Sequence, residues 1–470
     1  MNIIIITIDC LRRDRCGIYE HHRNTTPTID TLGQNGTIFK RAYATGPVTT
    51  ESFPGILAGR LSAHTVAGQN IYQKRLPKQA PTVASRLHDN GWETTAVISN
   101  PRIGEHTAID RGFEKFKNLR NSGSVNTDRG LLSDIVPELS VGERLYQLRE
   151  RMRSLNTLPL RYEIPFLGFR YYQQFSGWPS VSGRKVVDEF LKSLEDTETP
   201  FFAWTHLMDV HGPINPESIA QTNLEDTSTI TQFRSQARRV SNVADVRTEA
   251  RYDSAVRYVD TQVRRIVQHL KSNNQWDETS IIITSDHGEA LCERGLYGHP
   301  QQYMYDELLS VPLVVRTPNE RGGINDHPFS LGWIHEIIAE LCSVQSLTAP
   351  LTSTYREHLS EKELNASELD IIPSDSIGPD GHSIAVRNLS DKYVTHTLQT
   401  THSDELSVGP HGHFDTLHDP QERTPLDNTN SELVREAQEI KTNVQNINTN
   451  GEVRGIDEEV ADQLKQLGYS

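Results

Sequence analysis

Short apolar runs, rich in β-branched residues, alternate along the chain with segments whose apolar residues recur at helical spacing. Strands are predicted at residues 3–8, 37–44, 94–99, 201–205, 281–284 and 311–316. Helices are predicted at residues 28–32, 51–57, 82–90, 186–194 and 457–467, and where Val256, Val259, Val263, Ile266, Val267 and Leu270 recur. This alternation predicts an α/β protein with a mostly parallel central sheet.

The pattern also divides the chain. Residues 1–348 carry the alternation and form the predicted catalytic domain, except for an arginine- and aromatic-bearing stretch at about 118–183 that indicates a helical insertion. Residues 349–381 are rich in Ser, Glu and Pro and are predicted to be a linker. Residues 382–470 are predicted to form a smaller C-terminal α+β subdomain, with a small antiparallel sheet and terminal helices.

Charge and composition exclude some classes of partner. The chain has 470 residues and a net charge of −15, which argues against nucleic acid as a partner. No apolar run approaches the roughly 18 residues that span a bilayer. The start, MNIIIITIDC, lacks a basic leader and a small-residue cleavage site, so we expect a cytoplasmic protein. The sequence does not indicate an oligomeric state.

Polar residues that can carry chemistry stand just after the predicted strands, where open α/β sheets bind ligands. They are Asp9, Thr49, Asn100, Asp209, His211, Asp286 and His287. Each aspartate or threonine could simply cap the next helix. As a set at one sheet edge, two aspartates, one histidine and one threonine hydroxyl instead favour an oxygen-rich site for Mg²⁺, Mn²⁺ or Ca²⁺, with Zn²⁺ also possible.

The order of these segments resembles the sulfatase family of the alkaline phosphatase-like superfamily. The resemblance is carried by ITIDCLRRD, by residues 26–60, by FFAWTHLMDVHGP, by SDHGEALCERGLYGHP and by YDELLSVPLVVRTP. It implies an alkaline phosphatase-like sandwich, with helices on both sides of the sheet. It also implies one bound divalent ion, Ca²⁺ in the usual members.

Counting back from Ala58-Gly59-Arg60 places Thr49 at the family's nucleophile position. Thr cannot become formylglycine, so we expect none here. Other departures are Glu51 and Phe53 at the family's Pro and Arg positions, Cys10 in place of a second aspartate, and Ser99-Asn100-Pro101 in place of Lys-Trp-His. These changes remove cationic contacts to sulfate.

The resemblance and the residue chemistry together assign roles. The predicted metal ligands are Asp9, Thr49, Asp286 and His287; the predicted catalytic residues are Thr49, His211 and His299; and the predicted substrate-binding residues are Asn100, His206 and Asp209. By residue type, Asp209, His211 and His299 could instead hold a second ion. Two acids on the long helix, Asp253 and Asp260, are predicted to be surface charges, and Arg12 and Asp14 are predicted to brace the first turn.

The predicted function is hydrolysis of a sulfate ester on a carbohydrate or small molecule, with metal-activated Thr49 as the nucleophile. One alternative is a phosphomonoesterase, phosphodiesterase or phospho-group transferase on the same scaffold. An alternative of another class is a non-catalytic protein that binds anions or glycans.

Overall fold

The computed structural model describes residues 1–67, 74–119, 181–212, 214, 246–318, 322–347, 349, 351, 371–378, 381–398, 411–427 and 430–444, all within one compact unit. The predicted insertion and the predicted helix at 457–467 fall almost entirely outside these residues. No helix in the described ranges has both the length and the apolar character to cross a membrane.

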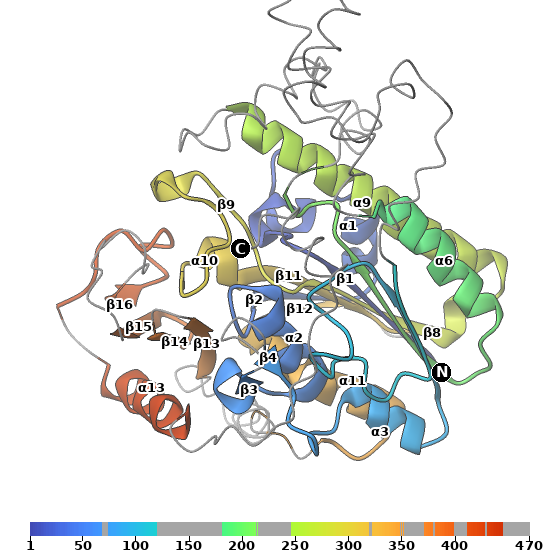
Figure 1. Ribbon diagram of the computed structural model, residues 1–470. Coiled ribbons are helices and arrows are strands. Elements are labelled where there is room, and N and C mark those ends of the chain that lie inside the picture. The colour runs from blue at the N-terminus through green and yellow to red at the C-terminus, as the bar shows by residue number, and fades with distance from the viewer. Residues whose placement is uncertain are drawn as a thin grey trace, which may run out of the picture. The chain divides into compact units, whose positions relative to one another are not determined.

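An eight-stranded sheet forms the centre of this unit (Figure 1). Its strands are β1 (Asn2–Ile8), β2 (Thr37–Tyr43), β5 (Glu93–Ile98), β6 (Lys115–Asn118), β7 (Phe201–Leu207), β8 (Thr279–Ser285), β11 (Ser310–Arg316) and β12 (Gly323–Ser330). Their spatial order is β12-β2-β11-β8-β1-β7-β5-β6. All run parallel except β11, which pairs antiparallel with β2 and β8, so the predicted mostly parallel sheet is confirmed.

The register of the central strands brings distant residues to the same level. Ile8, the last residue of β1, pairs with Leu207 on one side and with Ser285 on the other. Because the three strands are parallel and end together, the residues that follow them emerge at one edge of the sheet. Asp9 and Asp286 are therefore neighbours although 277 positions separate them.

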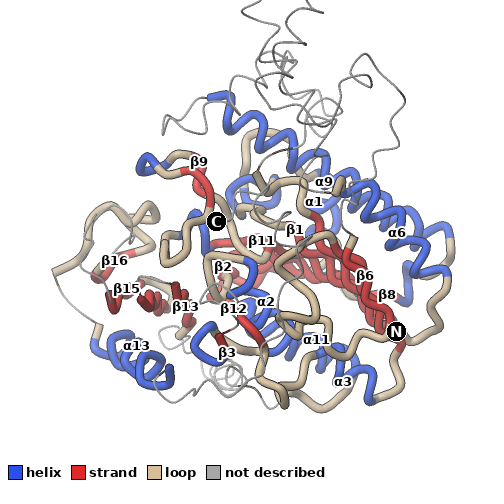
Figure 2. The backbone as a smooth tube through the Cα atoms, in the orientation of Figure 1, coloured by secondary structure: helices blue, strands red, loops and turns tan. Residues whose placement is uncertain are grey.

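Helices cover both faces of the sheet. The helices are α1 (Pro27–Gln34), α2 (Thr49–Ala58), α3 (Val83–Asp89), α6 (Gly183–Glu195), α9 (Val246–Ser272) and α11 (Ile334–Cys342). Figure 2 shows α1, α6 and α9 on one face and α2, α3 and α11 on the other. Alternate residues of β1 face the two sides: Ile3 and Ile5 join one apolar cluster, whereas Ile4 and Ile6 join the other.

The sequence pattern did not predict β12 or α11. The β12 segment, GINDHPFS, is mostly polar, contains Pro328 and lies at the edge of the sheet next to β2. Edge strands tolerate both features, because one side of the strand needs no hydrogen-bonded neighbour. Because this segment is mostly polar, the pattern of apolar runs does not predict the strand.

A second sheet lies toward the C-terminus and is antiparallel, as predicted. Its order is β13 (Ile372–Gly378), β14 (Gly381–Arg387), β15 (Asp391–Leu398) and β16 (Gly412–Asp415), and α13 (Ser431–Val444) packs against it. Here the structure differs from the sequence prediction, because β13 lies inside the segment assigned as a linker. This strand contains Ser374, Asp375 and Ser376, and the hydrogen-bond partners of these polar residues lie far away in the sequence.

Those contacts join β13 to the chain just before α2. Ser374 Oγ donates a hydrogen bond to the Ala44 carbonyl, and Asp375 N–H donates to the Thr45 carbonyl, at 2.6 and 2.9 Å. The Asp375 carboxylate accepts hydrogen bonds from the Ser62 and Ala63 amides at 2.6 and 2.7 Å. Strand β13 therefore holds the segments on both sides of α2.

The two aspartates predicted to be surface charges are buried instead. Asp253 accepts hydrogen bonds from Arg23 and His21, and Asp260 accepts from the amides of Thr28 and Ile29 at the start of α1. The sequence prediction was wrong because the partners lie more than 200 positions away. Arg12 and Asp14 do pair in the first turn, as predicted, with Nη2 and Oδ2 2.7 Å apart.

A buried ionic cluster connects the C-terminal sheet to the segment before β11. Lys392 on β15 pairs with Glu422 and Asp306, and Arg387 on β14 pairs with Asp306. The Lys392 and Glu422 side chains are fully buried. The Arg387 guanidinium also stacks on Tyr43 at 3.6 Å from the ring centre. Each charge is compensated, which a buried charge requires.

We expect Lys392→Met to destabilise the protein by about 3 kcal/mol or more, because it leaves the buried Glu422 and Asp306 carboxylates without their shared cation. Urea unfolding at neutral pH measures this. Lys192→Met, at an exposed lysine on α6, is the matched control and should change the midpoint little. Equal effects of the two variants would contradict the role of the cluster.

Candidate active site

Four predicted ligands meet at the carboxyl ends of β1 and β8. Nε2 of His287 lies 3.3 Å from Thr49 Oγ1, 3.6 Å from Asp286 Oδ2 and 3.8 Å from Asp9 Oδ1. All four residues are buried. Atoms that share one divalent ion lie about 3.0–3.5 Å apart, so these spacings are close to those of a ligand set.

Local backbone contacts hold this arrangement. Thr49 is the first residue of α2, and Ser52 one turn later donates its hydroxyl to the Asp286 carbonyl at 2.5 Å. Nδ1 of His287 lies 2.8 Å from the Gly288 carbonyl, which leaves Nε2 directed at the carboxylates. A Cβ at Gly288 would lie 2.0 Å from the Glu307 carbonyl oxygen, so only glycine fits after this histidine.

Asp9 is positioned by two residues that were predicted to bind substrate. Asn100 Nδ2 donates to Asp9 Oδ2 at 3.0 Å, and His206 Nε2 lies 3.1 Å from the same oxygen. Nδ1 of His206 contacts Thr7 Oγ1 at 2.9 Å. The structure thus places Asn100 and His206 in contact with a predicted metal ligand, where they fix Oδ2 of Asp9. The other oxygen, Oδ1, faces His287 and accepts a hydrogen bond from the Cys10 thiol at 3.0 Å.

Asp209, the third residue predicted to bind substrate, contacts the start of a helix. Its Oδ1 accepts a hydrogen bond from the Gly183 amide, the first residue of α6, at 2.9 Å. A Cβ at Gly183 would lie 2.4 Å from the other carboxylate oxygen. This is the helix-capping contact that an aspartate after a strand can also make.

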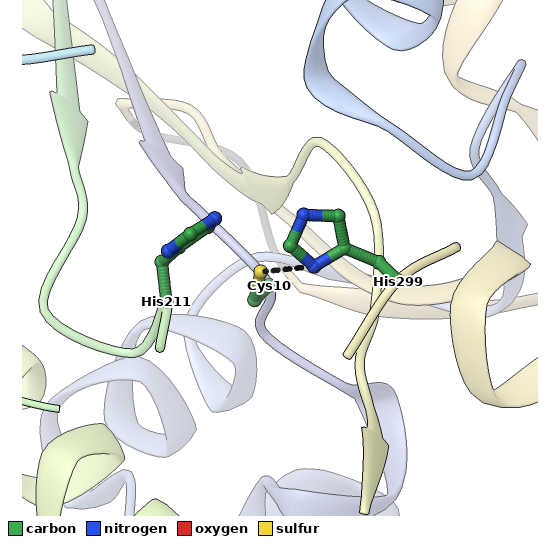
Figure 3. A group of neighbouring side chains, drawn as sticks. All are labelled: Cys10, His211 and His299. Carbon is green, nitrogen blue, oxygen red and sulfur yellow. Dashed lines mark hydrogen bonds between the residues drawn. The ribbon is translucent and has the colours of Figure 1, made fainter. Parts of the chain in front are cut away.

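Beside the four-residue group lies a second one that the sequence analysis did not assemble. Cys10 Sγ lies 3.6 Å from His299 Nδ1, and the His211 and His299 rings are 4.9 Å apart (Figure 3). Glu289, also buried, pairs with His299 through Oε2 and Nδ1 at 3.2 Å. The sequence counted Cys10 only as a lost carboxylate and did not single out Glu289, although both stand within three residues of a predicted ligand.

The buried carboxylates and histidines shift one another's pKa values. Burial raises the pKa of Asp9, but His211, His206 and His287 outweigh it and hold the pKa below its ordinary range. Burial and the neighbouring Asp9 raise the pKa of Asp286. Burial lowers the pKa of His287, yet Asp286 and Asp9 reverse this, and its pKa is raised. The two carboxylates therefore compete for the available positive charge.

Two further pKa shifts concern His211 and Glu289, which lie beside Cys10 and His299. Burial lowers the pKa of His211 to about 4, so its imidazole is neutral at neutral pH. Burial opposes ionisation of Glu289, but His299 and His211 bring its pKa down to about 2. A neutral imidazole can accept a proton or bind a cation, but it cannot donate a proton as imidazolium.

The residues present suit a divalent cation. Asp286 Oδ2 is buried and has no hydrogen-bond partner among the described residues. Oxygen and nitrogen atoms of Asp9, His206 and Asp286 lie within 4.8 Å of one another, as do ligand atoms of Asp9, Cys10 and His287. Two carboxylates this close are stabilised by a cation between them.

Two of the substituted positions after Thr49 are occupied by Phe53, which forms an apolar wall, and by Glu51. Phe53 on α2 packs edge-on against His206, with ring centres 5.1 Å apart, and against Trp204 on β7 at 5.0 Å. Glu51 is buried and accepts a hydrogen bond from the Ile377 amide of β13 at 3.1 Å. Neither residue offers a positive charge to an anionic substrate.

Comparison with known proteins gives one family. The Sulfatase family profile matches residues 1–353. Human iduronate 2-sulfatase is 24% identical over 69% of this chain, which spans only 61% of that protein. An arylsulfatase of Clostridium perfringens is 22% identical and matches 91% of this chain and 90% of its own length.

Solved structures agree on the fold. The phosphonate monoester hydrolase of Agrobacterium radiobacter superposes with a TM-score of 0.58 at 17% identity, covering 94% of this chain and 95% of its own. A protein in complex with its substrate D-glucosamine-2-N,6-O-disulfate superposes with a TM-score of 0.63 at 14% identity, covering 96% and 99%. The predicted alkaline phosphatase-like fold is thereby confirmed.

We expect Asn100→Asp to destabilise the metal-free protein at neutral pH by about 2 kcal/mol more than Asn100→Ala does, because it puts a carboxylate where a donor now faces Asp9. The new carboxyl should have a raised pKa in the folded state. The extra loss should therefore be present above that pKa and shrink as the pH falls through it. Urea unfolding of both variants with a chelator, across acid and neutral pH, measures the difference; equal stabilities at all pH values would contradict it.

Proposed function

Because this chain belongs to the sulfatase family, we propose that it hydrolyses a sulfate ester, with Thr49 as the nucleophile and one divalent cation held by Asp9, Thr49, Asp286 and His287. The observation that carries the proposal is the contact of Thr49 Oγ1 with His287 Nε2, at 3.3 Å, in a buried site with two carboxylates. No capping role accounts for a threonine hydroxyl that faces an imidazole 238 positions away.

The chain itself supplies several elements of catalysis. Thr49 begins α2, a ten-residue helix whose positive end favours an anionic ester group at the same place. Asn100 and His206 hold Asp9, while Ser52 and Gly288 fix Asp286 and His287, so the nucleophile and its neighbours need little rearrangement. When bound, a divalent cation would lower the pKa of the attacking hydroxyl and offset the charge of the ester oxygens.

The reaction would proceed by attack of Thr49 Oγ1 on sulfur, in line with the leaving oxygen, to give a sulfated threonine that water then hydrolyses. His211 and His299 lie beside the metal group and are the proposed residues for leaving-group chemistry. Since His211 is neutral at neutral pH, it would not act as an imidazolium acid.

The oxygen-rich ligand set favours Ca²⁺, Mg²⁺ or Mn²⁺, and His287 also permits Zn²⁺. A carbohydrate sulfate is the proposed substrate class, because relatives include iduronate 2-sulfatase and N-acetylgalactosamine-6-sulfatase. A phosphate or phosphonate ester is the second candidate. It is favoured by the uncharged Phe53, Ser99 and Pro101 at positions where usual sulfatases carry cations, and by a threonine nucleophile.

We expect Thr49→Ala to lower kcat by about 10³-fold or more on every ester the protein cleaves, and Thr49→Ser to retain part of the activity, because serine keeps the attacking hydroxyl. Steady-state assays with 4-nitrophenyl sulfate and 4-nitrophenyl phosphate measure this and rank the two chemistries. Intact-mass analysis should show an unmodified Thr49. Unchanged turnover by Thr49→Ala would refute the proposed nucleophile, and a phosphate preference of several orders of magnitude would replace sulfate by phosphate.

We also expect a chelator to abolish turnover and to lower the melting temperature, since an ion at 100 times its Kd adds about 2.7 kcal/mol of stability. Asp286→Asn should lose most of the stabilisation that added Ca²⁺ or Mn²⁺ gives. Asp277→Asn, at a side chain that is 83% exposed, should keep all of it. Differential scanning calorimetry with and without each ion measures the increments, and identical increments in the two variants would be evidence against this site.

A further inference from the structure

The group formed by Cys10, His211 and His299 has the residue types of a second, chemically different metal site. The sulfur and one nitrogen from each histidine all lie within 4.8 Å of one another. The three residues come from segments far apart in the chain: Cys10 follows β1, His211 follows β7, and His299 follows the β9–β10 hairpin (Ala290–Leu291 and Tyr297–Gly298). Figure 3 shows both imidazole rings beside the sulfur.

The spacing of the sulfur and nitrogen fits a tetrahedral zinc ion. With a Zn–S distance of about 2.3 Å, a Zn–N distance of about 2.0–2.1 Å and tetrahedral angles, the two ligand atoms would be about 3.6 Å apart. Cys10 Sγ and His299 Nδ1 are 3.6 Å apart.

We propose that Cys10, His211 and His299 form a site for a thiophilic divalent cation, Zn²⁺ before the others, next to the oxygen-rich site of the proposed function. Glu289 borders this group, because its Oε2 lies 3.2 Å from His299 Nδ1 and its side chain is only 3% exposed. One thiolate and one carboxylate would balance the two positive charges, which matters for a buried ion.

The ligand chemistry separates the two sites. Thiolate and imidazole select Zn²⁺ among the common divalent ions, whereas carboxylate and hydroxyl oxygens suit Ca²⁺, Mg²⁺ and Mn²⁺. Cys10 could alternatively join Asp9 and His287 around one shared ion. The Cys10 thiol contacts Asp9 Oδ1 at 3.0 Å, but the nearer imidazole is that of His299, at 3.6 Å. His287 Nδ1 faces the Gly288 carbonyl at 2.8 Å and lies 3.9 Å from the sulfur.

A second cation would also explain how this chain holds an anionic ester. Phe53, Ser99 and Pro101 stand where usual members carry positive side chains. An ion bound at Cys10 would return positive charge to this edge of the sheet and would act on the leaving group in place of the free His211 and His299 imidazoles. This last argument alone rests on the proposed function; metal binding itself does not.

The test uses Co²⁺ as the probe, because a thiolate bound to Co²⁺ gives a near-ultraviolet charge-transfer band that oxygen and nitrogen ligands do not give. The full-length protein should show this band, with Zn²⁺ displacing Co²⁺. Cys10→Ser should lose the band and bind one Zn²⁺ fewer per chain by elemental analysis after dialysis. Cys292→Ser, at a half-buried cysteine, is the matched control and should keep both.

Two further variants distinguish this site from a single shared ion. His299→Ala should weaken Co²⁺ binding at the thiolate by at least about tenfold, since even the loss of an outer-shell partner of a metal ligand costs roughly 10–100-fold. Asp286→Asn should leave the band in place. A band that persists in Cys10→Ser, or one that disappears in Asp286→Asn and persists in His299→Ala, overturns the proposal. Thr49→Ala should keep the band even where it loses turnover, so failure of this inference and failure of the proposed function give different results.

Discussion

Two carboxylates buried side by side constrain everything else in this site. Asp9 and Asp286 are fully buried and both lie within 3.8 Å of one imidazole nitrogen. Negative charges so close cannot both ionise without compensation. The structure gives Asp9 most of the neighbouring hydrogen-bond donors and raises the pKa of Asp286. A bound cation would compensate both carboxylates, which lie with Thr49 around the same imidazole nitrogen of His287.

The geometry of the backbone places these carboxylates and Thr49 next to one another. Parallel strands that end together bring Asp9 and Asp286 to one level, and the start of α2 brings Thr49 beside them. A glycine after His287 lets the chain pass within contact of the Glu307 carbonyl. Asp9, Asp286 and His287 stand in the first positions after buried strands and Thr49 opens a helix, so the site is held by the same contacts that stabilise the core.

The sequence predicted what strand order and residue type control. Asp9, Asp286 and His287 followed from their places after apolar strands, and Thr49 from its distance to Ala58-Gly59-Arg60. The sequence did not predict which polar residues form hydrogen bonds to other parts of the protein instead of binding substrate. Asn100 and His206 contact Asp9, and Asp209 contacts the start of α6, because these partners are distant in sequence. For the same reason, the sequence does not reveal the contacts of Cys10 and Glu289 with His299. The strands β12 and β13 were not predicted because their sequences are polar.

The contacts of β13 make the C-terminal sheet part of the scaffold that holds the start of α2. Its residues Ser374 and Asp375 hold the chain at Ala44 and Thr45, some 330 positions earlier and only a few residues before Thr49. A shortened polypeptide ending before this sheet would still contain every proposed ligand of both cations. It would lack the hydrogen bonds that hold the chain before the first turn of α2, so the C-terminal sheet supports the candidate site although it supplies none of its ligands.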